Sequence, residues 1–457
     1  MKRTHVLPTL LLSASAALLI SGCSYNQATP DQKMISGLKS EIRNPNHFVS
    51  SYLGGKVRDN WLRTFHDPTL NKLVIEAQKN NPDIRLAAGR IEQAAAIMRL
   101  TQANAIPQLN LQGNYSIRSW KAQNHYDRGN IAAVASWEPD LWGRLANQTL
   151  REKELTLAQV AEYEWARQSL SANTAKAWFL LESDRMIYDF AKEVVKIQAQ
   201  AESIFSKRAE IGEGNQRDVH MLRGMLAEAK ENETTALSAK ENDTRALETL
   251  IGRYPANAIR SHRLSKVPSA IPAGVPADLL NRRPDVIAAQ DRVAAAFHNK
   301  EATKLLRLPR ITLGVQIGFD VLRDTMSKLI SGLFMPIADA GTIQAQIDAA
   351  SAEQKMAIEQ YRSTVLNAFR EVENYLAFEK QLAKRFNYLD TMVKEYKTTY
   401  DMTDANYKIG QGTLIDVLTV QAKWIQARIL KVQVHKERLV NRVNLHLALG
   451  GSFDNRR

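Results

Sequence analysis

The chain has 457 residues, of which 44% are hydrophobic and 24% charged, so it is long enough to bury a sizeable core. Its formal net charge of +13 raises the question of a nucleic-acid partner, but its Lys and Arg residues are spread along predicted helices that also carry Glu, with no cluster of basic and aromatic residues. We therefore expect solvated helix surfaces and no nucleic-acid partner.

The N-terminus has the pattern of a secretory signal. Positive residues precede a short apolar stretch, Leu10–Ile20, and we predict that residues 1–22 are the signal peptide. The segment ends at Cys23, the only cysteine of the chain, so disulfide bonds play no part. Ile20-Ser-Gly-Cys23 resembles the bacterial lipobox, which implies that Cys23 is lipidated. A lone cysteine is usually a buried apolar residue, but a position directly after the signal favours the lipid, and Ser24 implies the outer membrane.

Beyond residue 22, no apolar run reaches the roughly 18–20 residues of a membrane-spanning helix. A mature chain that crosses a membrane must then do so with strands closed into a barrel. Residues 23–60 show no firm periodicity, and we predict that they form a lipidated, extended tether.

The rest of the chain is internally duplicated. Asn80-Asn-Pro-Asp-Ile84 recurs as Arg282-Arg-Pro-Asp-Val286, and the two prolines are 284 − 82 = 202 positions apart. This spacing exceeds the roughly 20–50 residues of solenoid and propeller repeats. We predict two structural repeats, residues 61–254 and 277–451, joined by a proline-containing linker at 255–276 and followed by a tail at 452–457.

Each repeat is expected to contain a β-hairpin, at about 107–142 and about 309–338. In the first, Gln108–Ser119 alternates and Ile131–Trp137 returns across a polar turn, Asn124–Asn130. In the second, the candidates are Ile311–Phe319 and Leu329–Ile337. Alternation over about ten residues is typical of a membrane strand. Four strands are fewer than the about eight of the smallest barrels, so we expect several chains to share one barrel.

A helical hairpin is expected to complete each repeat, at 144–252 and 341–449. Both tracts lack proline and are rich in helix-forming residues. Their first arms are each close to ~68 residues, which would span roughly 100 Å. Each hairpin turns at a Gly-x-Gly sequence, and glycine permits the positive φ that such a turn needs. The four turn glycines are Gly212, Gly214, Gly410 and Gly412.

No motif in the sequence indicates catalysis. The nine histidines are scattered, and His-Glu-x-x-His, phosphate-loop and Gly-x-Ser-x-Gly patterns are missing. We therefore expect no enzymatic activity, no metal site and no cofactor other than the covalent lipid on Cys23.

Several strings resemble the TolC-like outer-membrane efflux family, in particular its lipoprotein branch, which serves tripartite drug and metal pumps. They include Trp61-x-x-x-Phe65-x-Asp67-Pro68, Trp137-Glu-Pro-Asp-Leu-Trp-Gly143 and, most specifically, Asp278-Leu-Leu-Asn-Arg-Arg-Pro-Asp285. The resemblance extends from about Trp61 to Gly451. It implies an α+β membrane protein in which three chains with four strands each close a 12-stranded β-barrel, continued in the periplasm by a long α-helical barrel.

The resemblance also implies a function and partners. A homotrimer of this kind is a passive exit duct that docks a periplasmic adaptor and, through it, an inner-membrane pump. The four turn glycines would form the docking tips, although turn chemistry alone explains them. The alternatives are a protein-secretion channel of the same fold and a structural envelope lipoprotein whose strands pair only locally. The sequence does not identify the cargo, which could be drugs or metal ions.

Residues beside the tips are the candidate gate. By resemblance, Asp416 would line a constriction, and Tyr407 would bond to Asp218 and tie the two hairpins together. Thr413-x-x-Asp416 and Asn215-x-x-Asp218 also fit the first turn of a helix, where capping alone would explain both aspartates.

Two further features are left open by the sequence. Thr419 stands where many relatives carry a second aspartate. We therefore expect weaker cation selectivity, or weaker block by divalent cations, than in a relative with both aspartates. Trp137 and Trp142 beside a strand end fit either interfacial aromatic residues or core packing.

Overall fold

The computed structural model describes residues 31–41, 46–50, 55, 57, 59–120, 124–261, 264–320 and 325–454. The predicted signal peptide and Cys23 lie outside these residues. The chain divides into two compact units. The first contains helix α2 and the stretches Ala88–Glu162 and Asp285–Thr364, and the second contains Asn44–Ala87, Tyr163–Pro284 and Val365–Arg457. Each unit therefore combines segments of both sequence repeats, because the long helices run from one unit into the other.

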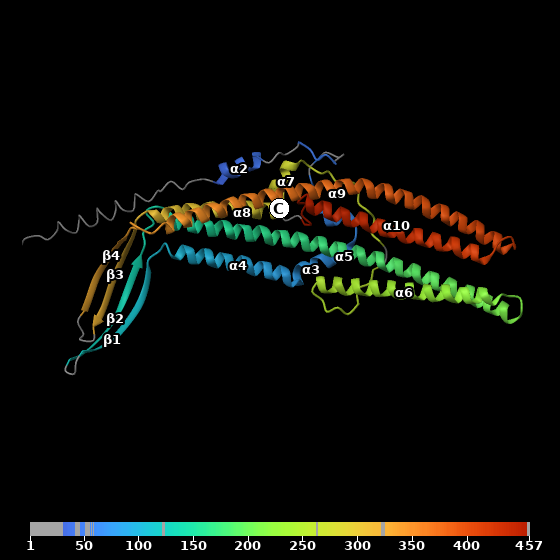
Figure 1. The fold of residues 1–457 in the computed structure, drawn as a ribbon, viewed down its shortest axis with the longest axis horizontal. Coiled ribbons are helices and arrows are strands. Elements are labelled where there is room, and N and C mark those ends of the chain that lie inside the picture. Colours follow the sequence, from blue (N-terminus) through green and yellow to red (C-terminus); the bar gives the residue numbers. More distant parts are fainter. Residues whose placement is uncertain are drawn as a thin grey trace, which may run out of the picture. The chain divides into compact units, whose positions relative to one another are not determined.

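The first unit contains a four-stranded antiparallel sheet in the order β1-β2-β3-β4 (Figure 1). Its strands are β1 Gln108–Trp120, β2 Asn124–Trp137, β3 Arg310–Asp320 and β4 Thr325–Phe334. The two predicted hairpins are thus present, and β2 pairs with β3 to join them into one sheet.

Two of the four predicted strands have wrong boundaries. Strand β2 starts at Asn124, where we expected a polar turn, and it pairs with β1 as far as Trp120. Ladder hydrogen bonds come from the backbone, so polar side chains do not end a strand. Strand β4 lies at Thr325–Phe334 and not at Leu329–Ile337. It ends before Pro336, which has no N–H to donate to a ladder.

The long helices agree closely with the prediction. Helices α5 (Arg144–Glu210) and α9 (Thr342–Lys408) have 67 residues each, and α6 (Gln216–Leu250) and α10 (Leu414–Ala448) have 35 each. In Figure 1, α6 runs back along α5, and α10 runs back along α9. The equal lengths repeat the duplication seen in the sequence. Within the described part of the chain, no helix is both long enough and apolar enough to traverse a membrane.

Shorter helices complete the two units. Before the first hairpin lie η1 (Trp61–Phe65), α3 (Pro68–Asn80) and α4 (Pro82–Ala103), and before the second lie α7 (Pro276–Arg282), α8 (Pro284–Lys304) and η2 (Leu305–Arg307). The main core of the second unit gathers Trp61, Phe65, Phe179, Leu247 and Leu439.

The N-terminal tether is partly helical, which contradicts the extended segment that we predicted. Asp31–Glu41 forms α2, in which Leu38 is buried and the sulfur of Met34 lies 3.5 Å from Nε2 of Gln354 in α9. This segment has too few apolar residues to show a helical period. The helix could therefore not be predicted from the sequence, and its contact with α9 became visible only in the structure.

The linker and the first residues of the tail belong to the second unit and make contacts within it. Glu248 accepts hydrogen bonds from the backbone N–H groups of Asn257, Ala258 and Ile259, at 2.8, 2.5 and 3.1 Å. These bonds hold the pKa of Glu248 below its ordinary value, although burial opposes them. Phe453 of the predicted tail belongs to the main core.

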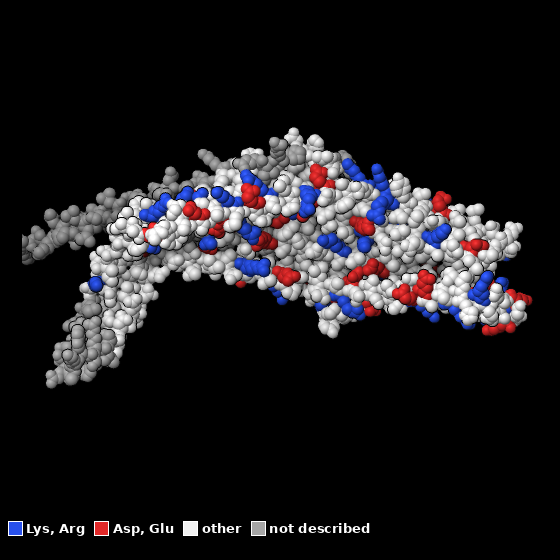
Figure 2. Space-filling view, viewed as in Figure 1, with Lys and Arg blue, Asp and Glu red and all other residues white. Residues whose placement is uncertain are grey.

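Charges of both signs are interspersed along the helices on the face seen in Figure 2. The net charge of +13 is therefore not gathered into one basic patch on that face.

Candidate functional site

One face of the sheet is apolar and exposed. Odd-numbered residues of the four strands share this face, because the register pairs Leu111 with Ala133, Ala133 with Ile317 and Ile317 with Ser327. Leu111 is 77% exposed and Leu329 79%. The exposed apolar residues of this face are Leu109, Leu111, Tyr115, Ile131, Leu313, Val315, Ile317, Phe319, Leu329 and Leu333. A contiguous apolar face of this kind requires an apolar environment or a partner.

The opposite face of the same sheet is mainly polar. Side chains alternate along a strand, so even-numbered residues point away from the apolar face. They include Gln108, Asn110, Gln112, Thr312, Gln316 and Lys328. The sheet therefore separates an apolar side from a polar one.

The two tryptophans at the base of the sheet are half-exposed hydrogen-bond donors. The Nε1–H of Trp137 donates to the carbonyl of Ala105 at 3.0 Å, and that of Trp142 donates to the carbonyl of Pro309 at 2.7 Å. The carbonyl of Pro309 lies directly before β3, and that of Ala105 lies three residues before β1. Each ring is 38% exposed, so neither tryptophan is a core residue. Such rings suit a boundary between apolar and wet surroundings.

The hairpin tips of the second unit have the same backbone geometry. Gly212 and Gly410 both have φ +80°, as predicted. Glu213 N–H donates to the carbonyl of Arg208 at 2.8 Å, and Gln411 N–H donates to that of Asn406 at 2.9 Å. These six-to-one hydrogen bonds, with a left-handed glycine before them, are the Schellman ending of a helix.

The second glycine of each pair has a different role from the one we predicted. Neither Gly214 nor Gly412 has a positive φ. A Cβ added at Gly214 would lie 2.7 Å from the backbone nitrogen of Ala209, whereas one at Gly412 would come no closer than 3.7 Å to its neighbours. Close backbone approach therefore requires glycine at position 214, and nothing in the geometry requires it at 412.

This difference predicts opposite results for two matched substitutions. We expect Gly214→Ala to destabilise its tip by about 1–3 kcal/mol, because backbone atoms must move. We expect Gly412→Ala to be neutral or to stabilise by up to about 1 kcal/mol, since alanine restricts the unfolded chain. Hydrogen exchange of the tip amides measures both. Equal protection in the two variants would contradict the assignment.

Asp416 is the third helical residue of α10 and forms a capping box with Thr413, the N-cap residue. The Oγ1 of Thr413 accepts from Asp416 N–H at 3.2 Å, and the Asp416 carboxylate accepts from Thr413 N–H at 3.2 Å and from its hydroxyl at 2.6 Å. This reciprocal capping box lowers the pKa of Asp416 through the Thr413 side chain first and its backbone second. The capping alternative is thus confirmed, and gating stays a prediction.

Asp218 does not form the matching box. Asn215 caps α6 by accepting from Arg217 N–H at 2.9 Å, and the Asp218 carboxylate lies 3.5 Å from Nε of Arg217. No hydrogen bond joins Tyr407 to Asp218 among the described residues. The latch between these two residues therefore stays a prediction.

The starts of α6 and α10 lie close together within the second unit. Leu222 and Leu418, shortly after Asp218 and Asp416, pack with Ala201 of α5 in one apolar cluster. The structure thus brings the two predicted gate positions to the same end of the unit.

A ladder of aromatic and basic side chains behind the tips was not predicted from the sequence. Trp424 stacks on Tyr400 with centroids 5.5 Å apart, and Arg428 lies 4.1 Å from the centroid of Phe190 and 2.9 Å from Glu193. The ladder joins α5, α9 and α10. The i, i+4 spacing of Trp424 and Arg428 was its only sequence signal.

A metal centre has no candidate among the described residues, where no group of three or more His, Cys, Asp or Glu side chains converges.

Comparison with known proteins identifies the family. The profile described as Outer membrane efflux protein matches residues 73–253 and 275–451, in other words both repeats. The chain belongs to the outer membrane efflux protein family.

The relatives of this outer membrane efflux protein span nearly its whole length. It is 27% identical to the cation efflux system protein CusC of Escherichia coli, covering 98% of this chain and 99% of the relative. It is 25% identical to the toluene efflux pump outer membrane protein TtgC of Pseudomonas putida, covering 97% and 96%. The open state of the Neisseria gonorrhoeae MtrE outer membrane channel superposes with a TM-score of 0.80 at 25% identity, covering 91% and 97%.

The family and these relatives establish the cellular location and the general function of the protein. The protein is an outer-membrane efflux channel whose helices extend into the periplasm.

Proposed function

We propose that three copies of this outer membrane efflux protein form a passive exit duct of a tripartite pump. Each copy would give its four strands to a shared 12-stranded β-barrel in the outer membrane. The observation that carries the proposal is the two-faced sheet: the side with Leu111 and Leu329 suits lipid, and the side with Gln112 and Lys328 suits a wet interior. The paired 67- and 35-residue helices would continue the tube in the periplasm.

The duct needs an energy source elsewhere, since its candidate residues offer no catalytic group. A periplasmic adaptor would dock at the hairpin tips around Gly212 and Gly410 and connect the duct to an inner-membrane pump. The relatives are named for cations and for toluene, so we propose small molecules or metal ions as cargo. The same fold could serve protein secretion. Measuring the export of small molecules and of proteins by cells that carry or lack this chain distinguishes the two functions.

Images of the purified full chain test the assembly. We expect three-fold particles longer than about 100 Å, the length that 67-residue helices alone would give at about 1.5 Å per residue. Monomers or irregular rods would rule out the shared barrel and favour the structural lipoprotein.

Lipidation of Cys23 is a separate proposal. Labelling with radioactive palmitate should mark the wild-type chain and should not mark Cys23→Ser. Equal labelling of both would place any lipid elsewhere.

The role of Asp416 in conduction is separable from its role as a cap. The side-chain carbonyl oxygen of asparagine can still accept from the Thr413 N–H, so Asp416→Asn should keep the capping box while removing the charge. If three carboxylates line a constriction, planar-bilayer recordings should show lower cation selectivity in this variant. Unchanged selectivity would leave Asp416 as a cap only.

Thr419 provides the converse test. Its hydroxyl bonds to the carbonyl of Ile415 at 2.7 Å and its side chain is exposed. We expect Thr419→Asp to increase block by divalent cations. Similar block in wild type and variant would contradict the idea that this gate is less acidic than that of a two-aspartate relative.

A further inference from the structure

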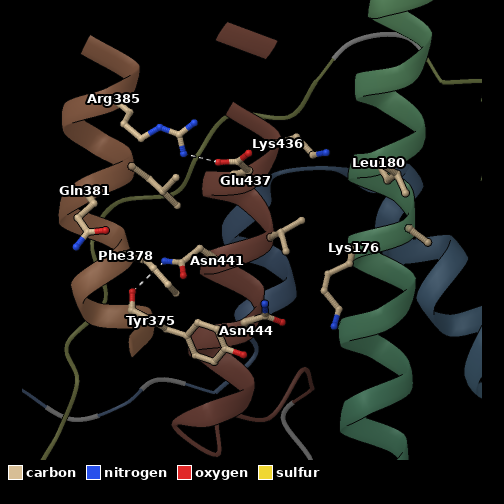
Figure 3. Close-up of a pocket in the computed structure, with 13 residues that line it drawn as sticks. Lys176, Leu180, Tyr375, Phe378, Gln381, Arg385, Lys436, Glu437, Asn441 and Asn444 are labelled. Atoms are coloured by element: carbon tan, nitrogen blue, oxygen red, sulfur yellow. Dashed lines mark hydrogen bonds and ion pairs between the residues drawn. The ribbon is translucent and has the colours of Figure 1, made fainter. Parts of the chain in front are cut away.

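A cavity in the second unit has an apolar wall and an excess of positive charge. It measures about 620 Å³ and lies between α5, α9 and α10 (Figure 3). Its apolar surface comes from Ala177, Leu180, Phe378, Leu382 and Val440. This volume lies within the roughly 300–1,000 Å³ of small-molecule sites.

Four charged side chains line the cavity, and only two of them form a pair. Arg385 donates to the Glu437 carboxylate at 2.9 Å. Figure 3 shows Lys176 extending from α5 and Lys436 from α10, neither joined to another residue of the cavity. Within the described part of the chain, neither ammonium has a carboxylate oxygen at salt-bridge distance. The lining of the cavity therefore includes two positive charges that form no ion pair within the described residues.

Both lysines lie in surroundings that favour an anion. Burial lowers the pKa of the Lys176 ammonium, since its charge is poorly solvated. The charge of Lys436 also acts on Asp184, whose own pKa is raised to about 7, first by burial and then by Asp243. Asp184 is therefore a weaker counter-charge for Lys436 than an ordinary aspartate would be.

A second cavity in the same unit provides an internal contrast. It measures about 530 Å³, lies between α5, α6 and α10, and is also mainly apolar. Its charged lining residues are Asp184 and Glu228, with no Lys or Arg among them. The two cavities thus differ in the sign of their charge, and the first is the one that matches an anion.

We propose that the cavity between α5, α9 and α10 binds an amphiphilic organic anion. The hydrocarbon body would lie on the apolar wall, and the carboxylate or sulfonate would lie between the ammonium groups of Lys176 and Lys436. Free amide groups at Gln381 and Asn444 also line the cavity and can donate hydrogen bonds. Binding of this kind does not depend on the export function, because it is a property of the purified protein.

Fluorescence titration tests the proposal directly. The probe is undecanoic acid carrying a dansyl group, added to the full chain in phosphatidylcholine nanodiscs, with empty nanodiscs subtracted. The methyl ester of the probe has nearly the same apolar body without the charge. We expect saturable binding of one acid per chain. The ester should bind at least about tenfold more weakly than the acid, because it cannot form the desolvated ion pair.

A matched pair of variants locates the site. Lys176→Met combined with Lys436→Met keeps the apolar stems and removes both charges, and it should bind acid and ester alike. Lys423→Met, which removes an exposed lysine of α10 outside the cavity, should bind as wild type does.

Three outcomes would overturn the proposal. These are equal binding of acid and ester by wild type, unchanged acid binding by the double variant, and no saturable binding. The comparison of acid with ester uses wild type alone, so it decides the matter even if the double variant folds poorly.

Discussion

Replacing Leu111 by arginine is expected to prevent stable insertion into the outer membrane, whereas replacing the adjacent Gln112 by arginine is expected to permit it. Leu111 lies on the apolar face of the sheet, paired with Ala133, and Gln112 lies on the polar face. An arginine facing lipid near the middle of a bilayer costs roughly 2–4 kcal/mol. In a trimer that cost occurs three times.

The measurement is the amount of folded protein in purified outer membranes, judged by resistance to protease and by migration on unheated gels. The two substitutions are neighbours in one strand, so differences in expression or strand propensity are small. If both variants insert equally well, or if neither inserts, the two faces do not have the environments proposed here.

The second large effect concerns a buried ion pair between α9 and α10. Arg442 donates to Glu379 at 2.6 Å, and their side chains are 2% and 9% exposed. Arg442 also donates to the carbonyl of Ser269, and Asn441 donates to Glu379 at 3.2 Å. Arg442→Met leaves the carboxylate buried without its cation, which should destabilise the protein by about 3–5 kcal/mol.

An exposed pair between the same two helices provides the control. Arg385 lies 2.9 Å from Glu437, with side chains 56% and 42% exposed. Arg385→Met should cost only about 0–1 kcal/mol, because solvent screens the charges. Urea midpoints of the helical circular dichroism signal measure both variants under one condition.

Restoring charge balance tests the reason for the loss. The double variant Arg442→Met with Glu379→Leu should recover most of the stability, since no lone charge remains buried. A deficit of about 1 kcal/mol is expected from the carbonyl of Ser269, which loses its donor. If the double variant is as unstable as Arg442→Met alone, packing and not charge explains the effect.

Several elements could be predicted because their signals are local. The proline-free tracts that end at Gly-x-Gly predicted the boundaries of helices α5 and α9 to within one residue. The spacing of Thr413 and Asp416 gave the capping box, which depends on residues of one helical turn. Alternation gave the existence of the four strands, although not the start of β2 or the position of β4.

Other features depended on contacts between distant segments. Three segments have too few apolar residues to show a clear period: helix α2, the linker and the tail with its buried Phe453. The residues that they contact lie elsewhere in the chain. The distinction between Gly214 and Gly412 rests on how closely the backbone approaches each position, 2.7 Å at Gly214 and 3.7 Å at Gly412, which identical Gly-x-Gly strings cannot encode.

The sequence by itself determined the duplication, the helical hairpins, the strand-forming segments and the family, because each follows from patterns along one stretch of chain. Only the tertiary structure decided that β2 pairs with β3, that Arg442 meets Glu379, and that Lys176 and Lys436 line one cavity. These pairs are separated by many residues, and their proximity depends on how helices and strands pack, a property that local patterns do not contain.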